Sequence, residues 1–433
     1  MLLPSIARVR QRFLQPEEPD VATAVARAIR TSRIGERVRQ GGSVAVTAGS
    51  RGIAGIDVIV RAAVDTLREL GFAPFVVAAM GSHGGGSAEG QRALLQEFGI
   101  TEEALGCSIR TEMETLVLGT NSYGLPIHFD RNAYAADGIL LLNRIKPHTS
   151  FQGPYESGLL KMLTIGLGKR AGAAQVHKLG FTGMKRLLPE VGSFLLAKTP
   201  VALGVAVLEN AADRTAKVVA VEPEELLDVE PRLLDEARGL MATLPFDQID
   251  VLIVGELGKN YSGTGLDPNV IGRLRVETLS EPTRPVVTRL AVLDVSVESG
   301  GNALGIGLAD LTTDRLVRAI DPVPVRVNSI TSNVLARARI PLSLPTDRDV
   351  LTACLETCWR TEWSEARMVL IANTLELSTL WVTPPLAAEV EAHPALSFET
   401  DFQPIPLNTQ GALDQETLFP ESLRGRRAVA ARS

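Results

Sequence analysis

Buried apolar runs and amphipathic stretches alternate along the first half of the chain. The apolar runs 43–47, 72–80 and 138–143 predict strands, since each is short and each is followed by glycine or polar residues. Apolar residues at helical spacing predict helices at 57–70 and at 87–98, the second with Ser87 as its N-cap. Strands that are joined by helices favour a parallel sheet with both faces covered.

The same alternation returns in the second half of the chain. A strand is predicted at 201–208 and an acidic helix at 222–243. The stretch 244–250 is typical of a linker, and the apolar run 251–254 restarts the pattern. Further strands are expected near 290–297 and 368–371, and further helices near 314–320 and 347–361.

These elements predict an α/β protein with two α/β domains and mostly parallel sheets. The 433 residues exceed what a single core usually holds. We place an N-terminal cofactor-binding and catalytic domain at 1–245 and a C-terminal substrate-closing domain at 246–395. Residues 396–433 are expected to form a tail that packs back on the N-terminal domain. Because parallel sheets bind ligands at the carboxyl ends of their strands, we expect the active site in the cleft between the domains.

Composition and charge narrow the class of protein. Hydrophobic residues make up 45% and charged residues 22% of the chain, as in a soluble globular protein. The 44 basic and 50 acidic residues give a net charge of −6 without a basic block, which argues against nucleic acid and membrane surfaces as partners. The charged N-terminus and the lack of a long apolar run predict neither a signal peptide nor a membrane span. Three cysteines fit a reducing compartment, so we expect a cytoplasmic enzyme.

Two of the five histidines directly follow predicted strands. His83 lies in Gly-Ser-His-Gly-Gly-Gly, and His148 lies in Lys-Pro-His-Thr. A single loop histidine is most often a solvated side chain, but two at strand ends of one sheet favour a shared site. Imidazole titrates near pH 6.5 and can take and return a proton at neutral pH. His128 and His393 are expected to be structural.

A lysine follows the second of these histidines. Lys161 is expected near the start of a helix that Ser157 and Gly158 open. Backbone N–H groups at such a helix start attract anions, and a lysine there can bind a phosphate or form a covalent bond. The alternative is an ordinary surface lysine.

In this order, the residues resemble the nickel-pincer lactate racemase family. That family has a glycine-rich histidine loop, a Pro-His pair, a lysine shortly afterwards, and a histidine sixteen residues beyond the lysine. His83, Pro147-His148, Lys161 and His177 match these positions, with the same final spacing. The resemblance covers most of the chain and is strongest over 44–180.

The resemblance implies a cofactor and a reaction. Lys161 would hold a nickel-pincer nucleotide through a thioamide, with Ser157 and Gly158 beside it, and His177 would coordinate the nickel. His83 and His148 would be an acid/base pair for racemisation or epimerisation of a 2-hydroxy acid. One histidine takes the hydroxyl proton while hydride passes to the cofactor, the oxo acid rotates, and the other histidine returns a proton. The implied partners are a small 2-hydroxy acid and the enzymes that synthesise the nucleotide.

Cationic residues are candidates for binding the substrate carboxylate. Arg51 matches an arginine in the corresponding loop of the family. A guanidinium at the end of a strand can hold a carboxylate through two hydrogen bonds. Ala48 stands where the family usually has an acid, so the local polar network differs from that of a lactate site. Extra polar groups in the second domain favour a substrate larger or more polar than lactate. The second-domain candidates for the carboxylate are Lys259, Arg273 and Arg275, and those for additional hydroxyls are Asn260, Ser262, Thr264 and Asp267.

Two other functions use the same residues. In a zinc hydrolase, His83, His148 and His177 would be metal ligands, although no acidic residue accompanies them at helical spacing. In a non-catalytic homologue the fold would only bind a cofactor or ligand, but a binding protein has no use for two proton-transfer groups. Cys354 and Cys358 are four residues apart on a predicted helix, where packing in the core is expected.

Overall fold

The computed structural model describes residues 2–50 and 53–420. The chain divides into two compact units, which we call the N-terminal unit, residues 14–241, and the C-terminal unit, residues up to 13 together with those from 242 onwards. Both are α/β units with mostly parallel sheets, which confirms the predicted fold class. Among the described residues, no helix has both the length and the apolar character that crossing a lipid bilayer requires.

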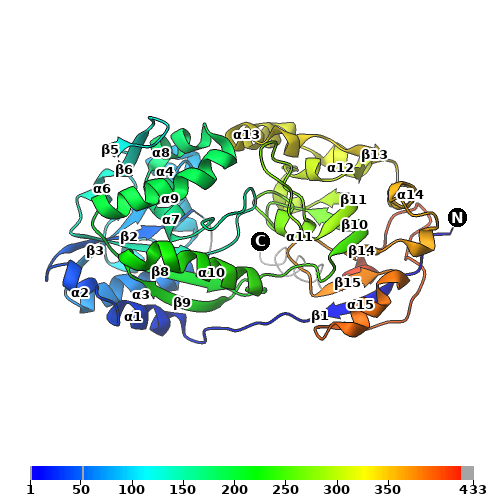
Figure 1. Ribbon diagram of the computed structural model, residues 1–433, viewed down its shortest axis with the longest axis horizontal. Helices are drawn as coiled ribbons and strands as arrows, with labels where there is room; N and C mark the ends of the chain where they lie inside the picture. The colour runs from blue at the N-terminus through cyan, green and yellow to red at the C-terminus, as the bar shows by residue number, and fades with distance from the viewer. Residues whose placement is uncertain (1, 51–52, 421–433) are drawn as a thin grey trace. The chain divides into compact units, whose positions relative to one another are not determined.

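A six-stranded sheet forms the centre of the N-terminal unit (Figure 1). Its strands, in spatial order, are β4 (Ile109–Arg110), β3 (Ala73–Ala78), β2 (Ser43–Ala48), β7 (Gly138–Arg144), β8 (Val201–Glu209) and β9 (Thr215–Val221). Only β9 pairs antiparallel within this sheet. A separate antiparallel pair consists of β5 (Thr115–Thr120) and β6 (Pro126–Asp130).

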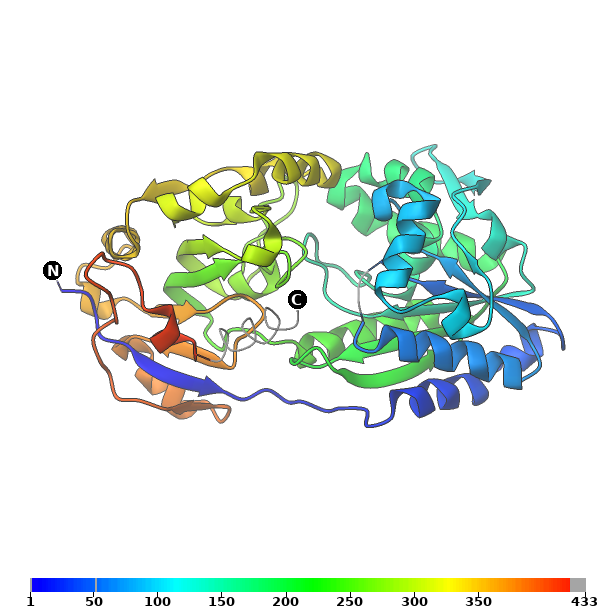
Figure 2. The same ribbon diagram turned by 180° about the vertical axis from the view of Figure 1, so that it is seen from behind.

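Helices cover both faces of this sheet because its strands are apolar on both sides. On β8, Leu203, Val205 and Val207 point into the core that α1 (Val21–Arg30) and α3 (Ile56–Glu69) cover. These helices lie along one face of the sheet (Figure 2). The alternate position Gly204 instead lies against Leu159 of α7 (Leu159–Lys161). The remaining helices of the unit are α2 (Ile34–Arg37), α4 (Ala88–Glu97), α5 (Glu102–Leu105), α6 (Arg131–Tyr134), α8 (Lys169–His177), α9 (Gly180–Lys198) and α10 (Leu226–Leu240).

The C-terminal unit contains an eight-stranded sheet. The strands, in spatial order, are β13 (Leu342–Leu344), β12 (Leu311–Thr313), β11 (Val286–Val295), β10 (Gln248–Leu257), β14 (Met368–Ile371), β15 (Thr379–Val382), β1 (Ala7–Gln11) and β16 (Leu396–Phe398). The first five are parallel, and the last three pair antiparallel. The helices are α11 (Pro268–Ile271), α12 (Asp314–Ala319), α13 (Pro322–Ser332), α14 (Asp347–Thr357), α15 (Ala387–Ala392) and α16 (Gln415–Leu418).

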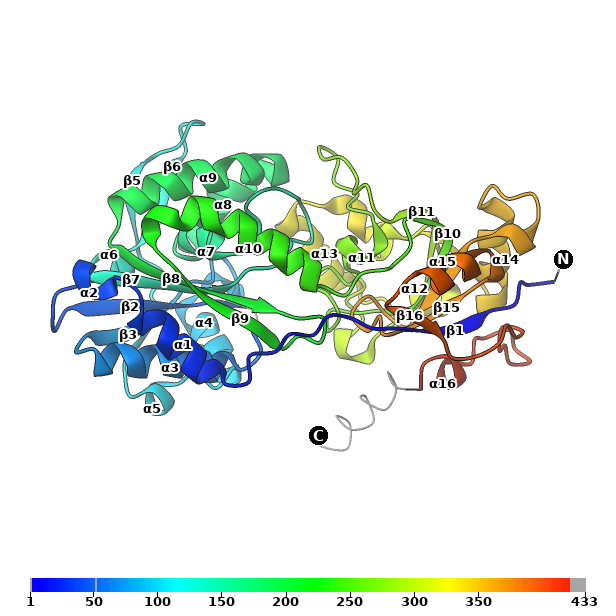
Figure 3. The same ribbon diagram turned by 60° about the horizontal axis from the view of Figure 1, so that its bottom comes forward.

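Both ends of the described chain belong to the C-terminal unit, which differs from the domain limits expected from sequence. Strand β1 lies between β15 and β16, where Val9 pairs with Leu380 on one side and with Phe398 on the other (Figure 3). Further along the chain, Leu413 and Leu418 are buried in this unit's core. These segments complete the sheet and core of the C-terminal unit, whereas the sequence analysis assigned them to the N-terminal domain and to a tail on it.

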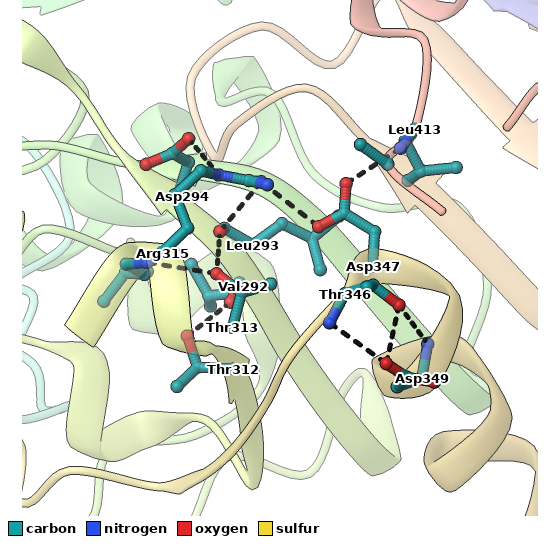
Figure 4. Close-up of polar contacts among 12 residues, drawn as sticks. Val292, Leu293, Asp294, Thr312, Thr313, Arg315, Thr346, Asp347, Asp349 and Leu413 are labelled. Atoms are coloured by element: carbon teal, nitrogen blue, oxygen red, sulfur yellow. Dashed lines mark hydrogen bonds and ion pairs between the residues drawn. The ribbon is translucent and has the colours of Figure 1, made fainter. Parts of the chain in front are cut away.

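A buried carboxylate fastens the end of the chain to α14. Asp347 accepts a hydrogen bond from the Leu413 N–H at 2.8 Å and pairs with Arg315 at 3.1 Å (Figure 4). Arg315 also pairs with Asp294, at the end of β11, at 2.8 Å. Burial raises the pKa of Asp347. The network therefore joins β11, α12, α14 and the 407–413 segment through Arg315 and two carboxylates.

Replacing that carboxylate tests its contribution to stability. We expect Asp347→Ala to lower the free energy of unfolding by about 2 kcal/mol, because it leaves the buried Leu413 N–H without its acceptor. Amide exchange at Leu413 should become faster. Glu356→Ala, at an exposed position of the same helix, is the control and should change neither quantity. Urea unfolding and amide exchange measure both effects, and unchanged exchange at Leu413 would contradict the assignment.

Candidate active site

Three neighbouring parallel strands end at the same edge of the N-terminal sheet. β2 lies between β3 and β7, with Ala48 paired to Ala78 and Val46 paired to Leu140. The segments that leave this edge contain Ser50, His83 and His148. The topology thus brings the two sequence-predicted histidine loops to either side of the β2 loop. Arg51, the third predicted residue at this edge, lies outside the described residues.

Hydrogen bonds from a buried glutamine fix the backbone of the His83 loop. Gln91 of α4 is fully buried, and its side-chain amide donates to the carbonyls of Gly81 at 3.1 Å and His83 at 3.2 Å. The His83 side chain is exposed, and its Nδ1 forms a hydrogen bond with the Ser50 hydroxyl. The histidine is therefore presented at the surface of the edge from a fixed backbone.

Gly84 shows why the His83 loop needs a glycine at this position. Gly84 has a φ of +62°, and a Cβ there would lie 2.7 Å from the backbone carbon of Gly90 in α4. Only glycine tolerates this conformation and this approach at little cost. The loop consequently lies directly on the first turn of α4, where Ser87 caps the helix as predicted.

A buried carboxylate organises the His148 loop. Glu156 accepts hydrogen bonds from the backbone N–H groups of His148 at 2.5 Å and Gly153 at 2.8 Å. Arg238 of α10 donates to the same carboxylate at 2.7 Å. Burial raises the pKa of Glu156, while these hydrogen bonds and the arginine oppose the rise. The carboxylate closes residues 148–156 into a loop and thereby sets the position of the His148 backbone.

The His148 ring itself has several contacts. Its Nδ1 accepts a hydrogen bond from the backbone N–H of Ser150 at 3.0 Å. The ring centroid lies 4.5 Å from that of Phe151 and 6.1 Å from that of Phe181. Both phenylalanines are buried. The protein therefore occupies one ring nitrogen, and two buried phenylalanines lie near the ring.

Lys161 is half-buried in a short helical turn that begins directly after this loop. Ser157 exchanges backbone hydrogen bonds with Lys146, at 2.9 and 3.3 Å. Asn143, near the end of β7, donates to the carbonyl of Gly158 at 2.7 Å. The turn is thus attached to the strand end that carries the His148 loop.

A glutamate side chain of the protein occupies the N–H groups at the start of this turn, where the sequence analysis expected a bound anion. Glu230 of α10 is buried and accepts from the Leu160 N–H at 2.8 Å. Its other oxygen lies 2.3 Å from where a Cβ at position 158 would stand, so a larger residue there would have to displace this carboxylate. Burial raises the pKa of Glu230 to about 7, although its backbone hydrogen bonds lower it. The predicted anion-attracting N–H group at Leu160 therefore already has a carboxylate partner.

Beyond Lys161 the chain returns to the end of β3. A π-helical turn, Met162–Gly166, packs there, with the Gly81 N–H donating to the Gly166 carbonyl at 3.2 Å. Lys169 opens α8 and is fully buried, donating to the Ala78 carbonyl at 2.6 Å and pairing with Asp130 at 2.8 Å. α8 ends at His177, whose side chain is not among the described groups.

A third carboxylate, which the sequence analysis missed, lies at the adjoining strand ends. Glu209, at the end of β8, forms an ion pair with Arg144, at the end of β7. Its other oxygen accepts from the Ala54 N–H at 2.9 Å. Glu156, Glu209 and Glu230 have no motif or regular spacing in the sequence. Only the fold shows that all three are buried beside loop backbone at one sheet edge.

In the C-terminal unit, two predicted carboxylate ligands have structural contacts. Arg273 donates to the carbonyls of Leu308 at 3.0 Å and Val287 at 2.9 Å and pairs with Asp310. Arg275 pairs with the same aspartate at 2.8 Å. These contacts differ from the expected substrate-binding role, because carbonyls and Asp310 take up the guanidinium N–H groups. Burial acts to raise the pKa of Asp310, but the two arginines hold it below its usual value.

The polar loop after β10 is also largely internal. Lys259 donates from Nζ to the Gly263 carbonyl at 2.7 Å and is half-buried. Ser262 and Thr264 are buried and share a hydrogen bond, and Asp267 caps α11. Asn260, in contrast, is exposed. Of the residues predicted to bind extra hydroxyl groups, only Asn260 therefore reaches the surface.

The described residues form neither a preformed metal site nor a disulfide. Within residues 2–50 and 53–420, no group of three His, Cys, Asp or Glu side chains is arranged to hold a metal ion. Cys354 and Cys358 are buried without a disulfide, and burial raises the pKa of both thiols.

Comparison with known proteins places this edge in context. Residues 6–187 match a family model described as the lactate racemase N-terminal domain. Among solved structures, the chain resembles the lactate racemase apoprotein from Thermoanaerobacterium thermosaccharolyticum, with a TM-score of 0.53 and 10% identity. The match covers 84% of this chain and 94% of that one, and at this identity it shows a shared fold. No curated protein matches the sequence.

The raised pKa of Glu230 predicts a pH-dependent stability. Because its folded-state pKa of about 7 exceeds the unfolded value near 4.5, ionisation costs the folded state more than the unfolded state. The free energy of unfolding of the wild type should fall by up to about 3 kcal/mol between pH 4.5 and pH 8 through this group. Glu230→Gln removes this dependence and should gain stability relative to the wild type as pH rises.

Urea unfolding at both pH values measures this difference. Glu236→Gln, at an exposed position of the same helix, is the matched control and should follow the wild type at both pH values. If Glu230→Gln also follows the wild type across this range, Glu230 does not titrate as described.

Proposed function

The chain belongs to the lactate racemase family through residues 6–187, and from this premise we propose that it is a racemase or epimerase of 2-hydroxy acids that uses a nickel-pincer nucleotide. The observation that carries the proposal is the common edge of β3, β2 and β7. The His83 loop, the His148 loop and the turn with Lys161 all leave or return to that edge.

The residues at the carboxyl ends of these strands have the functional groups that such a cofactor needs. Lys161 offers an amine for covalent attachment, on a turn that Glu230 and Asn143 hold in place. His177, at the end of α8, would supply one nitrogen ligand to the nickel. When bound, the cofactor would supply a hydride acceptor. Ser157 and Gly158 would lie beside it, while its phosphate needs a partner other than the Leu160 N–H.

The protein's own part in the reaction is proton transfer and orientation. A 2-hydroxy acid can become an oxo acid only if its hydroxyl proton leaves, and histidines are suited to accept it near neutral pH. His83 and His148 lie on separate loops, held by Gln91 and by Glu156, and we assign them to the oxygen of the substrate. We assign the substrate carboxylate to Arg51, which follows β2 in the sequence. Because Ala48 replaces the acid usual in the family, we propose that the substrate is not lactate but a larger or more polar 2-hydroxy acid.

Intact-protein mass spectrometry with metal analysis tests the cofactor. The protein is produced together with the enzymes that synthesise the pincer nucleotide, since we propose that these are its maturation partners. We expect a covalent adduct and about one nickel ion per chain. Lys161→Ala should lose the adduct. Lys178→Ala, at an exposed position that ends α8, should keep it. An unmodified wild-type chain that contains zinc instead of nickel would contradict the proposal and favour a metal hydrolase.

The reaction is tested with the loaded protein. Each enantiomer of lactate and glycerate is incubated with it, and chiral chromatography follows the appearance of the opposite enantiomer. His83→Ala should reduce the rate by roughly 100-fold or more, because a general base contributes about that much. A variant that interconverts the enantiomers as fast as the wild type would exclude His83 from proton transfer.

A further inference from the structure

A buried lysine stands midway in the sequence between the two residues that would hold the cofactor. Of the lysines that the structure describes, only Lys169 is buried, and it lies at the midpoint between Lys161 and His177. Its backbone is left-handed, with a φ of +53°. Both features cost free energy, because a buried ammonium needs partners and a left-handed backbone is unfavourable for any residue with a Cβ. The surrounding contacts must therefore hold this residue in place.

The Lys169 ammonium connects the ends of two strands. Its Nζ donates to the Ala78 carbonyl at 2.6 Å, at the end of β3, and pairs with Asp130 at 2.8 Å, at the end of β6. Asp130 is itself fully buried and caps α6 through its other oxygen. The Asp130 backbone N–H donates to the Leu167 carbonyl at 2.7 Å, just before α8. The start of α8 is thus attached to strands of two different sheets.

The left-handed residue also separates two helical segments. The π-helical turn Met162–Gly166 comes before it, and the rest of α8 comes after it. Between them, a Cβ at Gly168 would lie 2.5 Å from the Thr164 carbonyl oxygen, so the chain passes very close to the π-helical turn. A left-handed residue does not continue a right-handed helix. The conformation of Lys169 therefore sets the direction in which α8 starts.

Helix α8 packs against other parts of the candidate site. A Cβ at Gly86, in the His83 loop, would lie 2.7 Å from Cδ of Arg170 in the first turn of α8. The helix also lies along β6 (Figure 1). A displacement at the start of α8 would therefore shift both its contact with the His83 loop and the helix end that contains His177.

We propose that Lys169 is a positioning residue for the nickel site, and this inference rests on the function proposed above. The ion pair with Asp130 and the hydrogen bond to β3 fix the start of α8. The helix then holds His177 at the separation from Lys161 that a single bound cofactor requires. Because the Lys169 side chain is buried, it acts through the helix that it anchors and needs no contact with cofactor or substrate.

The anchoring is measured by amide exchange on the protein without cofactor. Lys169→Met removes the charge and the donor, and the milder Asp130→Asn removes the partner charge but keeps an oxygen that can cap α6. In both variants, exchange in α8 should accelerate by a larger factor than exchange in α3. Leu67→Ala, in the core under α3, controls for a general loss of stability and should give the opposite pattern. If neither variant accelerates exchange in α8 more than in α3, the proposal is wrong.

The effect on the metal is measured as nickel release to EDTA from protein produced with the pincer-synthesis enzymes. Lys169→Met and Asp130→Asn should keep the adduct on Lys161 but release nickel roughly 10-fold faster or more, because residues that orient a metal ligand contribute that much to metal affinity. Leu67→Ala should release nickel at the wild-type rate.

Two results of the release measurement overturn the proposal. One is a wild-type release rate in both variants at Lys169 and Asp130. The other is release from Leu67→Ala as fast as from these variants, since lost stability then explains the effect. Wild-type protein that takes up neither adduct nor nickel refutes the proposed function, and the positioning role falls with it, whereas amide exchange still decides whether Lys169 anchors α8.

Discussion

Where the chain leaves the carboxyl end of a strand, its backbone N–H groups no longer have a partner in the sheet. Burying such N–H groups without another hydrogen-bond acceptor is costly. In the N-terminal unit, three buried carboxylates meet this need at adjoining loops. Glu156 binds N–H groups of the His148 loop, Glu209 binds the chain just beyond the β2 loop, and Glu230 binds the turn of Lys161. The candidate active site therefore depends on carboxylates that fix the backbone, with the chemically active side chains placed on top of it.

The sequence predicted the elements that have a strong pattern. The long apolar strands β2, β7, β8 and β10 and the amphipathic helix α3 lie where their periodicity placed them, because burial on one or both faces determines these residues directly. The histidine loops followed from the same pattern, since they begin where strands end. Strands β1 and β16 have three to five residues and pair across nearly the whole chain, which local periodicity does not reveal.

Side-chain roles were harder to predict than positions. Arg273 and Arg275 lie in the long connection after β10, where a carboxylate ligand was expected, yet Asp310 and backbone carbonyls bind them. Likewise, Ser262, Thr264 and Asp267 form a polar stretch in the sequence and are buried within their own loop. In both cases the residue type and its place in the element were informative, but the partner came from a segment distant in sequence or from a turn whose shape the sequence alone leaves open.

The position of β1 in the sheet affects how the chain can fold while it is being synthesised. Strand β1 pairs with β15 and β16, which are synthesised more than 360 residues after it. Residues 14–241 can acquire their own core in the meantime, since domains generally fold as units from the N-terminus. During that interval β1 has both edges unpaired and an apolar face uncovered. The nascent chain therefore carries an unpaired strand through this interval, and Arg8 and Arg10 within it are the kind of charged side chain that protects such a strand from pairing with another chain.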